Sequence, residues 1–149
     1  MSEEPAGLRE LKSMVGVEGR PFVVEVDKTT IRRFVEAVGD GNPLWQGGQG
    51  KTMLAPPYLF CASMISGRAT WPETPWPFKR GVDGGAEWEI FEQVKLGDTI
   101  TSVTRLSDIS EREGRSGKMY LVTAETTHRN QTGAVVGKSR STIIGFDPL

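Results

Sequence analysis

The residues best suited to chemistry lie in a short loop that begins at Asp40. The loop reads Asp-Gly-Asn-Pro-Leu-Trp over residues 40–45 and directly follows a segment with helical periodicity. A carboxylate such as Asp40 can orient or activate a water molecule, and Asn42 is a second polar candidate. The same residue types build tight turns, because Asp and Asn side chains accept hydrogen bonds from nearby backbone N–H groups. The catalytic and the turn interpretations of both residues stay open.

The chain has one histidine, His128, and one cysteine, Cys61. This count excludes a Cys/His metal site within one chain, and we expect no metal. Cys61 cannot form an internal disulfide, which fits a reducing compartment such as the cytoplasm. Cys61 lies in an apolar run, so we interpret it as a buried, inert thiol. His128 shares one face of a predicted strand with alternate residues from Tyr120, and we expect a structural or surface role for it.

The composition is that of one globular domain. The chain has 149 residues, of which 37% are hydrophobic and 25% are charged, and this length is sufficient for a core. The net charge of -1 provides no basic excess for binding nucleic acid. No apolar run approaches the roughly 20 residues of a membrane span, and the N-terminus lacks the features of a signal peptide. We expect one domain over residues 1–149, loosely ordered over 1–19 apart from a short helix around residues 8–14.

The elements that must position the loop follow from periodicity. Residues 21–26 are compact and β-branched, which predicts a strand. Asp27 or Thr29 is suited to cap a helix over about residues 30–38, which Gly39 ends. After a glycine-rich loop, Ala55-Pro56-Pro57 introduces a second helix that is apolar around most of its circumference and ends near Gly67.

The second half of the chain predicts four long strands, over residues 86–94, 99–109, 118–129 and 134–146. Short turns join them, which favours an antiparallel meander. A helix that is apolar on all sides and a long sheet must cover each other. The sequence therefore predicts an α+β hot-dog fold, in which a long antiparallel sheet is wrapped around a central buried helix.

Four motifs carry a resemblance to a known family: Val38-Gly39-Asp40-x-Asn42-Pro43, Ala55-Pro56-Pro57, Leu96-Gly97-Asp98 and Asn130-Gln131-x-Gly133. Over about residues 20–146 the chain resembles the MaoC-like hydratases and dehydratases, in particular their N-terminal half-type. The loop of that family reads roughly Gly-Asp-x-Asn-Pro-x-His, and its Asp and His add water to an acyl thioester or remove it. Here Trp45 stands at the histidine position. Its indole N–H is a donor only and cannot replace the base.

The resemblance implies a set of site residues. Asp40 and Asn42 are the catalytic candidates, and Trp45 is a hydrophobic wall, a hydrogen-bond donor or simply a residue that packs within the loop. The start of the second helix would bind the acyl thioester, with its carbonyl near the N–H groups of Tyr58 and Leu59; this adds Ala55, Pro57, Tyr58 and Leu59 to Trp45 as substrate-binding candidates. Lys79, Arg80, Lys138 and Arg140 are candidates for the phosphates of coenzyme A, with solvated surface charge as the alternative. We expect no cofactor beyond an acyl-CoA or acyl-carrier-protein thioester as substrate.

Three functions remain open. The chain is a hydratase or dehydratase subunit that lacks the catalytic histidine and pairs with a homologous catalytic subunit. Alternatively, it is a self-sufficient hot-dog lyase or thioesterase that uses Asp40, perhaps with Tyr58, or a non-catalytic acyl-CoA-binding module. A homodimer or a heteromer with a homologous hot-dog subunit is expected, because open sheet edges invite pairing.

Overall fold

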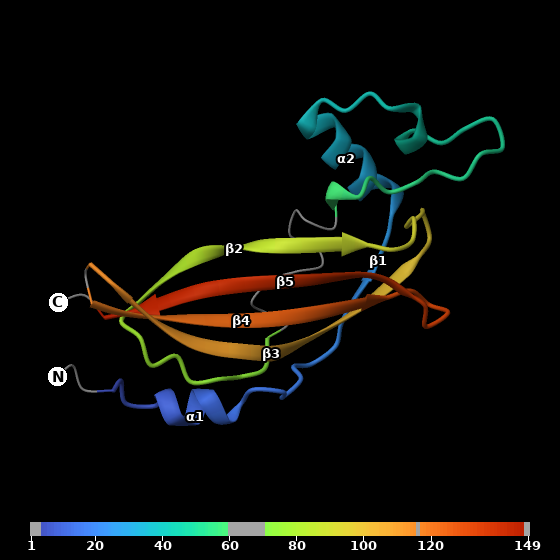
Figure 1. The fold of residues 1–149 in the computed structure, drawn as a ribbon. Helices are drawn as coiled ribbons and strands as arrows, with labels where there is room; N and C mark the ends of the chain where they lie inside the picture. Colours follow the sequence, from blue (N-terminus) through green and yellow to red (C-terminus); the bar gives the residue numbers. More distant parts are fainter. Residues whose placement is uncertain (1–3, 60–70, 116, 148–149) are drawn as a thin grey trace.

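The computed structural model describes residues 4–59, 71–115 and 117–147. Figure 1 shows a long curled sheet with helix α1 (Leu8–Ser13) beneath one face and helix α2 (Lys28–Val38) beyond one end. The strands are β1 (Phe22–Glu25), β2 (Arg80–Ile90), β3 (Thr99–Gly114), β4 (Gly117–Arg129) and β5 (Val135–Phe146). A 3-10 turn, η1 (Pro43–Trp45), follows α2. None of the helices in these ranges has the length and apolarity to cross a membrane.

The sheet has the strand order β1-β3-β4-β5-β2, and all of its pairs are antiparallel. The strands from β3 to β5 form the expected meander. The prediction is wrong for β2, which pairs with β5 rather than with β3, and which begins and ends earlier than the expected strand 86–94. The cause lies in the segment that follows β2. Its backbone forms hydrogen bonds with residues 53–55 and with Val26. The chain therefore passes from the β2 edge of the sheet towards the β1 edge before β3 begins.

Local sequence explains the ends of α2. Asp27 accepts a hydrogen bond from the Thr30 N–H at 2.9 Å and so caps the helix N-terminus. Gly39 ends the helix with a φ of 71°, a left-handed conformation that glycine adopts at little cost. Both features match the prediction. The apolar face of α2 buries Ile31 and Val35, and this packing fixes where the following loop begins.

The two faces of the sheet differ in character. Buried side chains alternate along β3 and β4 and define an inner face, which includes Ile100, Leu106 and Val122. One apolar cluster joins this face to α2 and η1, and a second joins it to α1, whose Leu8 and Leu11 are fully buried. The N-terminal segment is therefore anchored by α1 rather than loosely ordered along its whole length. The opposite, outer face carries the charged residues.

Only the first residues of the predicted central helix can be described. Tyr58 and Leu59 are helical, and Leu59 is buried in the cluster that contains α2. The remainder of that helix, including Cys61 and Gly67, lies outside the described residues.

His128 is fully buried on the inner face. Its Nδ1 lies 2.8 Å from the Ser102 hydroxyl, and its Nε2 lies 3.2 Å from the Ser139 hydroxyl. Its ring stacks on Trp88, with 5.5 Å between the ring centroids. Burial lowers the pKa of His128 from 6.5 to about 4. The residue is structural, as one of the two sequence interpretations had it.

The depressed pKa of His128 predicts a loss of stability in mild acid. The unfolded chain takes up a proton on His128 near pH 6.5, whereas the folded chain does so only near pH 4. The contribution of neutral His128 to the free energy of unfolding is therefore complete above pH 6.5. The free energy of unfolding falls as the pH drops from 6.5 towards 4, and the loss is about 2 kcal/mol at pH 5. Urea unfolding at pH 7.5 and pH 5 measures this difference. The His128→Gln variant, whose side chain cannot titrate, should be less stable at pH 7.5. Its free energy of unfolding should differ much less between the two pH values, and a difference as large as that of the unsubstituted chain would contradict the assignment.

Candidate functional site

The loop after α2 is folded by its own side chains. The Asp40 N–H donates to the Val35 carbonyl at 2.9 Å, which continues the helix end into the loop. The Asn42 side chain accepts from the Leu44 N–H at 3.0 Å and caps η1, which Pro43 begins. The turn interpretation of Asn42 is therefore supported by geometry, and the cap directs Trp45 back towards Asp40.

Three donors converge on the carboxylate of Asp40. Its Oδ2 accepts from the Trp45 indole N–H at 2.7 Å and from the Tyr58 hydroxyl at 2.6 Å. Its Oδ1 accepts from the Asn42 N–H at 3.0 Å. Asp40 thus joins the end of α2, the loop and the start of the second helix. The sequence placed Asp40, Asn42 and Trp45 in one loop and Tyr58 in the second helix, and the structure brings all four together.

The electrostatics follow from these contacts. Hydrogen bonds from the Tyr58 hydroxyl, the Asn42 N–H and the Trp45 indole hold the pKa of Asp40 below its usual value. Burial, then the hydrogen bond to Asp40 and then the charge of that carboxylate raise the pKa of Tyr58 to about 12. Near neutral pH, Asp40 is therefore an ionised acceptor and Tyr58 a protonated donor.

This arrangement has limited catalytic capacity. A general base works best with a pKa near the working pH and with a free lone pair towards water. Asp40 has a lowered pKa and already accepts three hydrogen bonds. Trp45 is 7% exposed and has no acceptor atom on its ring. In the loop, the partner of Asp40 is thus an N–H donor that cannot accept a proton, and the lowered pKa makes Asp40 itself a weak base.

The remaining substrate-binding candidates lie close to this cluster in the fold. Ala55 and Leu59 are buried in the same apolar cluster as Trp45, while Pro57 is exposed. The Ala55 carbonyl accepts from the Gln93 side chain at 2.8 Å, and its N–H donates to the Val94 carbonyl. Gln93 was not predicted, and no feature of its sequence context marks it. The Leu59 N–H donates to the Pro56 carbonyl at 2.9 Å, so within one chain it has a partner already.

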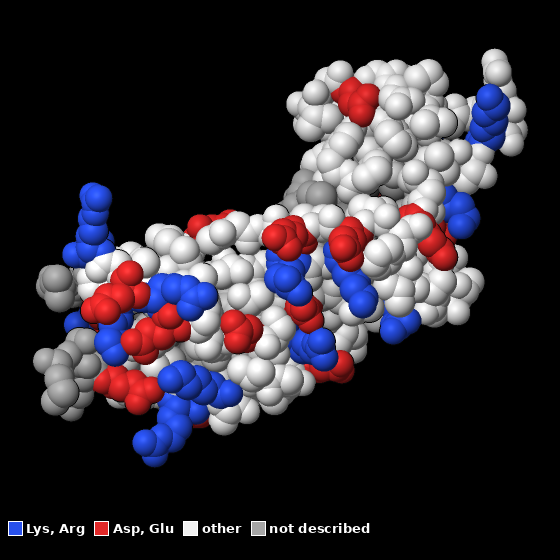
Figure 2. All heavy atoms as spheres, in the orientation of Figure 1, with Lys and Arg blue, Asp and Glu red and all other residues white. Residues whose placement is uncertain are grey.

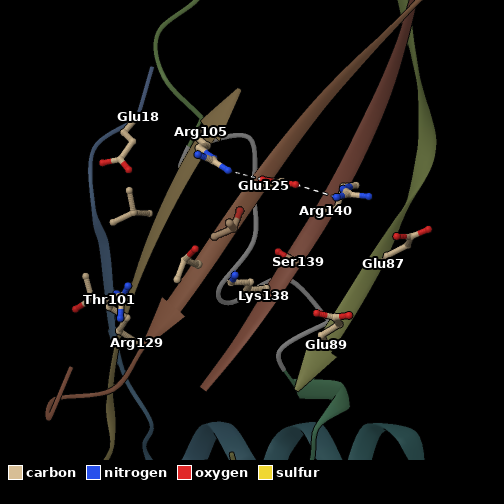
Figure 3. Close-up of a pocket in the computed structure, with 13 residues that line it drawn as sticks. Glu18, Glu87, Glu89, Thr101, Arg105, Glu125, Arg129, Lys138, Ser139 and Arg140 are labelled. Carbon is tan, nitrogen blue, oxygen red and sulfur yellow. Dashed lines mark hydrogen bonds and ion pairs between the residues drawn. The ribbon is translucent and has the colours of Figure 1, made fainter. Parts of the chain in front are cut away.

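The four coenzyme A candidates lie elsewhere in the chain. Arg80 begins β2 at the end of the sheet remote from α2 (Figure 1), and Lys79 directly precedes it. Lys138 and Arg140 lie on the outer face, in a hollow of about 620 Å³ (Figure 3). Arg140 forms an ion pair with Glu125 at 2.9 Å. Within a single chain these cations do not surround the Asp40 loop, and their role towards phosphate stays a prediction.

No group of three His, Cys, Asp or Glu side chains within residues 4–59, 71–115 and 117–147 is arranged to hold a metal ion. The acidic residue nearest the reactive loop is Asp40 itself, and its partners are hydrogen-bond donors.

Comparison with known proteins identifies relatives of this chain. A family sequence model described as "FAS1-like, dehydratase domain region" matches residues 13–139. A protein of Thermomonospora curvata named "Probable enoyl-CoA hydratase alpha subunit" is 27% identical over 146 residues, which cover 83% of this chain and 46% of the relative. A UPF0336 protein of Thermobifida fusca is 29% identical over 103 residues, covering 63% of this chain and 68% of that protein. The chain thus spans less than half the length of the first relative.

Solved structures share the fold. The ChsH1–ChsH2 complex of Mycobacterium tuberculosis includes a chain that matches with a TM-score of 0.72 at 17% identity, covering 96% of this chain and 90% of that one. A chain of the HadBC 3R-hydroxyacyl-ACP dehydratase complex of the same organism has a TM-score of 0.65 at 16% identity, with coverages of 89% and 97%. The R-hydratase PhaJ1 of Pseudomonas aeruginosa has a TM-score of 0.59 at 18% identity, with coverages of 89% and 82%. At these identities the likeness establishes the hot-dog fold alone.

The hydrogen bond from Tyr58 makes a prediction about Asp40. Tyr58→Phe keeps the ring that lies 5.5 Å from that of Phe34 but removes the hydroxyl donor. The pKa of Asp40 should then rise towards its usual value, because the largest cause of its depression is gone. A carboxyl-carbon NMR titration measures this directly. Tyr120→Phe is the matched control, and an equal rise of the Asp40 pKa in that variant would contradict the assignment.

Proposed function

Because the chain belongs to the family of MaoC-like hydratases and dehydratases, we propose that it is a component of an enoyl-thioester hydratase or 3-hydroxyacyl-thioester dehydratase. In this proposal a homologous hot-dog chain supplies the catalytic histidine. The observation that carries the proposal is the contact between Asp40 and Trp45. The loop retains the carboxylate and its hydrogen-bond donor, but the donor cannot accept a proton.

The hydration of an enoyl thioester requires a base for water, an acid for the α-carbon and a donor for the thioester oxygen. In this chain Asp40 is occupied by three donors and Tyr58 has a raised pKa. Neither residue is suited to take a proton near neutral pH. The buried apolar cluster around Trp45, Ala55 and Leu59 remains suited to shape a pocket for an acyl chain. These properties favour a pocket-forming role over a complete active site.

The relatives support the pairing of a pocket-forming chain with a homologous catalytic chain. The first curated relative is named as an alpha subunit, and this chain covers 46% of it. Two structures that share the fold are complexes of two different chains, ChsH1–ChsH2 and HadBC. A heteromer with a homologous hot-dog subunit is therefore the assembly that we propose for this chain, with an acyl thioester as substrate.

A second candidate is a self-sufficient lyase or thioesterase that uses Asp40. Tyr58 favours it, since its hydroxyl lies 2.6 Å from a carboxylate oxygen and could relay a proton. The lowered pKa of Asp40 opposes it. The third candidate, an acyl-CoA-binding module without turnover, uses the same pocket and differs from the proposal only in having no catalytic partner.

The purified chain alone should not hydrate trans-2-enoyl-CoA. Loss of the conjugated double bond, followed by ultraviolet absorbance with short and medium acyl chains, measures this. Addition of a co-purified homologous subunit that contains the loop histidine should produce turnover. If the chain alone shows turnover that Asp40→Asn abolishes without unfolding it, the self-sufficient enzyme is the correct assignment and the subunit role is wrong.

Trp45→His tests whether the missing base is the reason for inactivity. The imidazole can donate to Asp40 through one nitrogen and accept a proton at the other. We expect a gain in hydration over the unsubstituted chain, up to the roughly 100-fold at the lower end of what general acid–base catalysis contributes. Trp45→Phe is the control, because it removes the N–H without adding a base. An equal rate for the two variants would show that more than the histidine is missing.

A further inference from the structure

The segment that leads into the second helix, residues 53–57, is held between two other parts of the chain. On one side, the Leu54 N–H donates to the Leu44 carbonyl of η1 at 3.1 Å. On the other side, the connection between β2 and β3 binds it, because the Leu96 N–H donates to the Met53 carbonyl at 2.9 Å. This connection is therefore a third element of the candidate site, besides the reactive loop and the start of the second helix.

Gln93 adds side-chain hydrogen bonds to this connection. Its amide nitrogen donates to the Ala55 carbonyl at 2.8 Å and to the Val94 carbonyl at 3.0 Å. The Ala55 N–H donates to the same Val94 carbonyl at 2.9 Å. Ala55 and Val94 are each 1% exposed, whereas Gln93 itself is exposed. The contribution of Gln93 therefore comes from its two N–H donors rather than from burial of its side chain.

The residues after Ala55 depend on the direction of its carbonyl. Pro56 and Pro57 have no N–H group that could donate to it, and their rings hold φ at roughly −65°. A rotation at Ala55 is therefore passed on through two stiff residues to Tyr58. The Tyr58 hydroxyl donates to Asp40 at 2.6 Å, and hydrogen bonds weaken steeply when distance or angle departs from the optimum. The glutamine side chain thus fixes the first point of a short path that ends at the carboxylate.

We propose that Gln93 is a positioning residue of the candidate site, which binds the Ala55 carbonyl and so holds the start of the second helix where the Tyr58 hydroxyl reaches Asp40. The proposal rests on the proposed function, because it concerns the same site, and it adds a residue that lies outside both the loop and the helix. A buried carbonyl that loses its donor is costly. Without the amide of Gln93, the turn at Ala55 should therefore shift towards another donor or towards water.

The surroundings of Asp40 make its pKa a suitable measure of this position. Figure 2 shows few charged side chains over α2 and the following loop on the face in view, in contrast to the sheet. The pKa of Asp40 is lowered by hydrogen bonds, of which the one from Tyr58 is the largest cause, followed by those from Asn42 and Trp45. A displacement of the Tyr58 hydroxyl should therefore raise this pKa without interference from a neighbouring charge.

Gln93→Met keeps the length of the side chain and removes both donors. A carboxyl-carbon NMR titration of the chain alone should show a rise in the pKa of Asp40 that approaches the rise in Tyr58→Phe. Gln93→Ala is a second variant that removes the same donors, and its Asp40 pKa should rise in the same way. Urea unfolding verifies that each variant is folded before it is titrated.

Gln131→Ala is the matched control. The Gln131 side chain donates to Asp98 at 3.0 Å and accepts from the Thr99 N–H at 3.1 Å. This variant therefore also loses two hydrogen bonds of a glutamine side chain, but neither of them holds the segment before Tyr58. Its Asp40 pKa should equal that of the unsubstituted chain.

The double variant Gln93→Met/Tyr58→Phe separates positioning from a general loosening of the fold. If Gln93 acts through the Tyr58 hydroxyl, the double variant should have the same Asp40 pKa as Tyr58→Phe alone. The proposal is overturned by a further rise in the double variant, by an unchanged pKa in Gln93→Met and Gln93→Ala, or by an equal rise in Gln131→Ala. No substrate or partner chain is present in this titration, so its outcome is separate from the hydration measurements that decide the proposed function.

Discussion

The carboxylate of Asp40 is the point on which the organisation of the site depends. It accepts from Trp45 in the loop, from Tyr58 at the start of the second helix and from the backbone of its own turn. A neutral side chain at this position could not serve three donors equally well, because charged acceptors make the stronger hydrogen bonds. The same three hydrogen bonds that shape the loop lower the pKa of the carboxylate, which weakens Asp40 as a base. Asp40 therefore contributes more to the conformation of the loop than to proton transfer.

The sheet imposes a corresponding division between its two faces. The inner face accommodates polar groups only where they find partners, as His128 does between Ser102 and Ser139. The cost of charging that histidine in the core keeps it neutral and unavailable as a replacement for the missing loop base. The outer face is solvated, so its charges are free to form cross-strand pairs instead. The single histidine of this chain is therefore committed to the core of the sheet and does not reach the Asp40 loop.

Much of the fold could be predicted from local patterns. The cap at Asp27, the stop at Gly39 and the strands from β3 to β5 follow from turn chemistry and alternation, which act within a few residues. The placement of β2 beside β5 could not be predicted in the same way, because it depends on the segment after Ile90 pairing with residues 53–55 and with Val26. Sequence also indicated Asp40 and Trp45 as a pair, through the family loop. It did not indicate that Tyr58, 18 positions further along, donates to the same oxygen as Trp45.

Trp45 bears on the proposed assembly as well as on the chemistry of the loop. Two copies of this chain would bring together two loops in which the partner of Asp40 is a tryptophan, whose ring has no acceptor atom. His128 is buried between Ser102 and Ser139 in each copy and would add no exposed imidazole. The heteromer that we propose differs from this homodimer in one respect, because its second chain supplies a histidine at the loop.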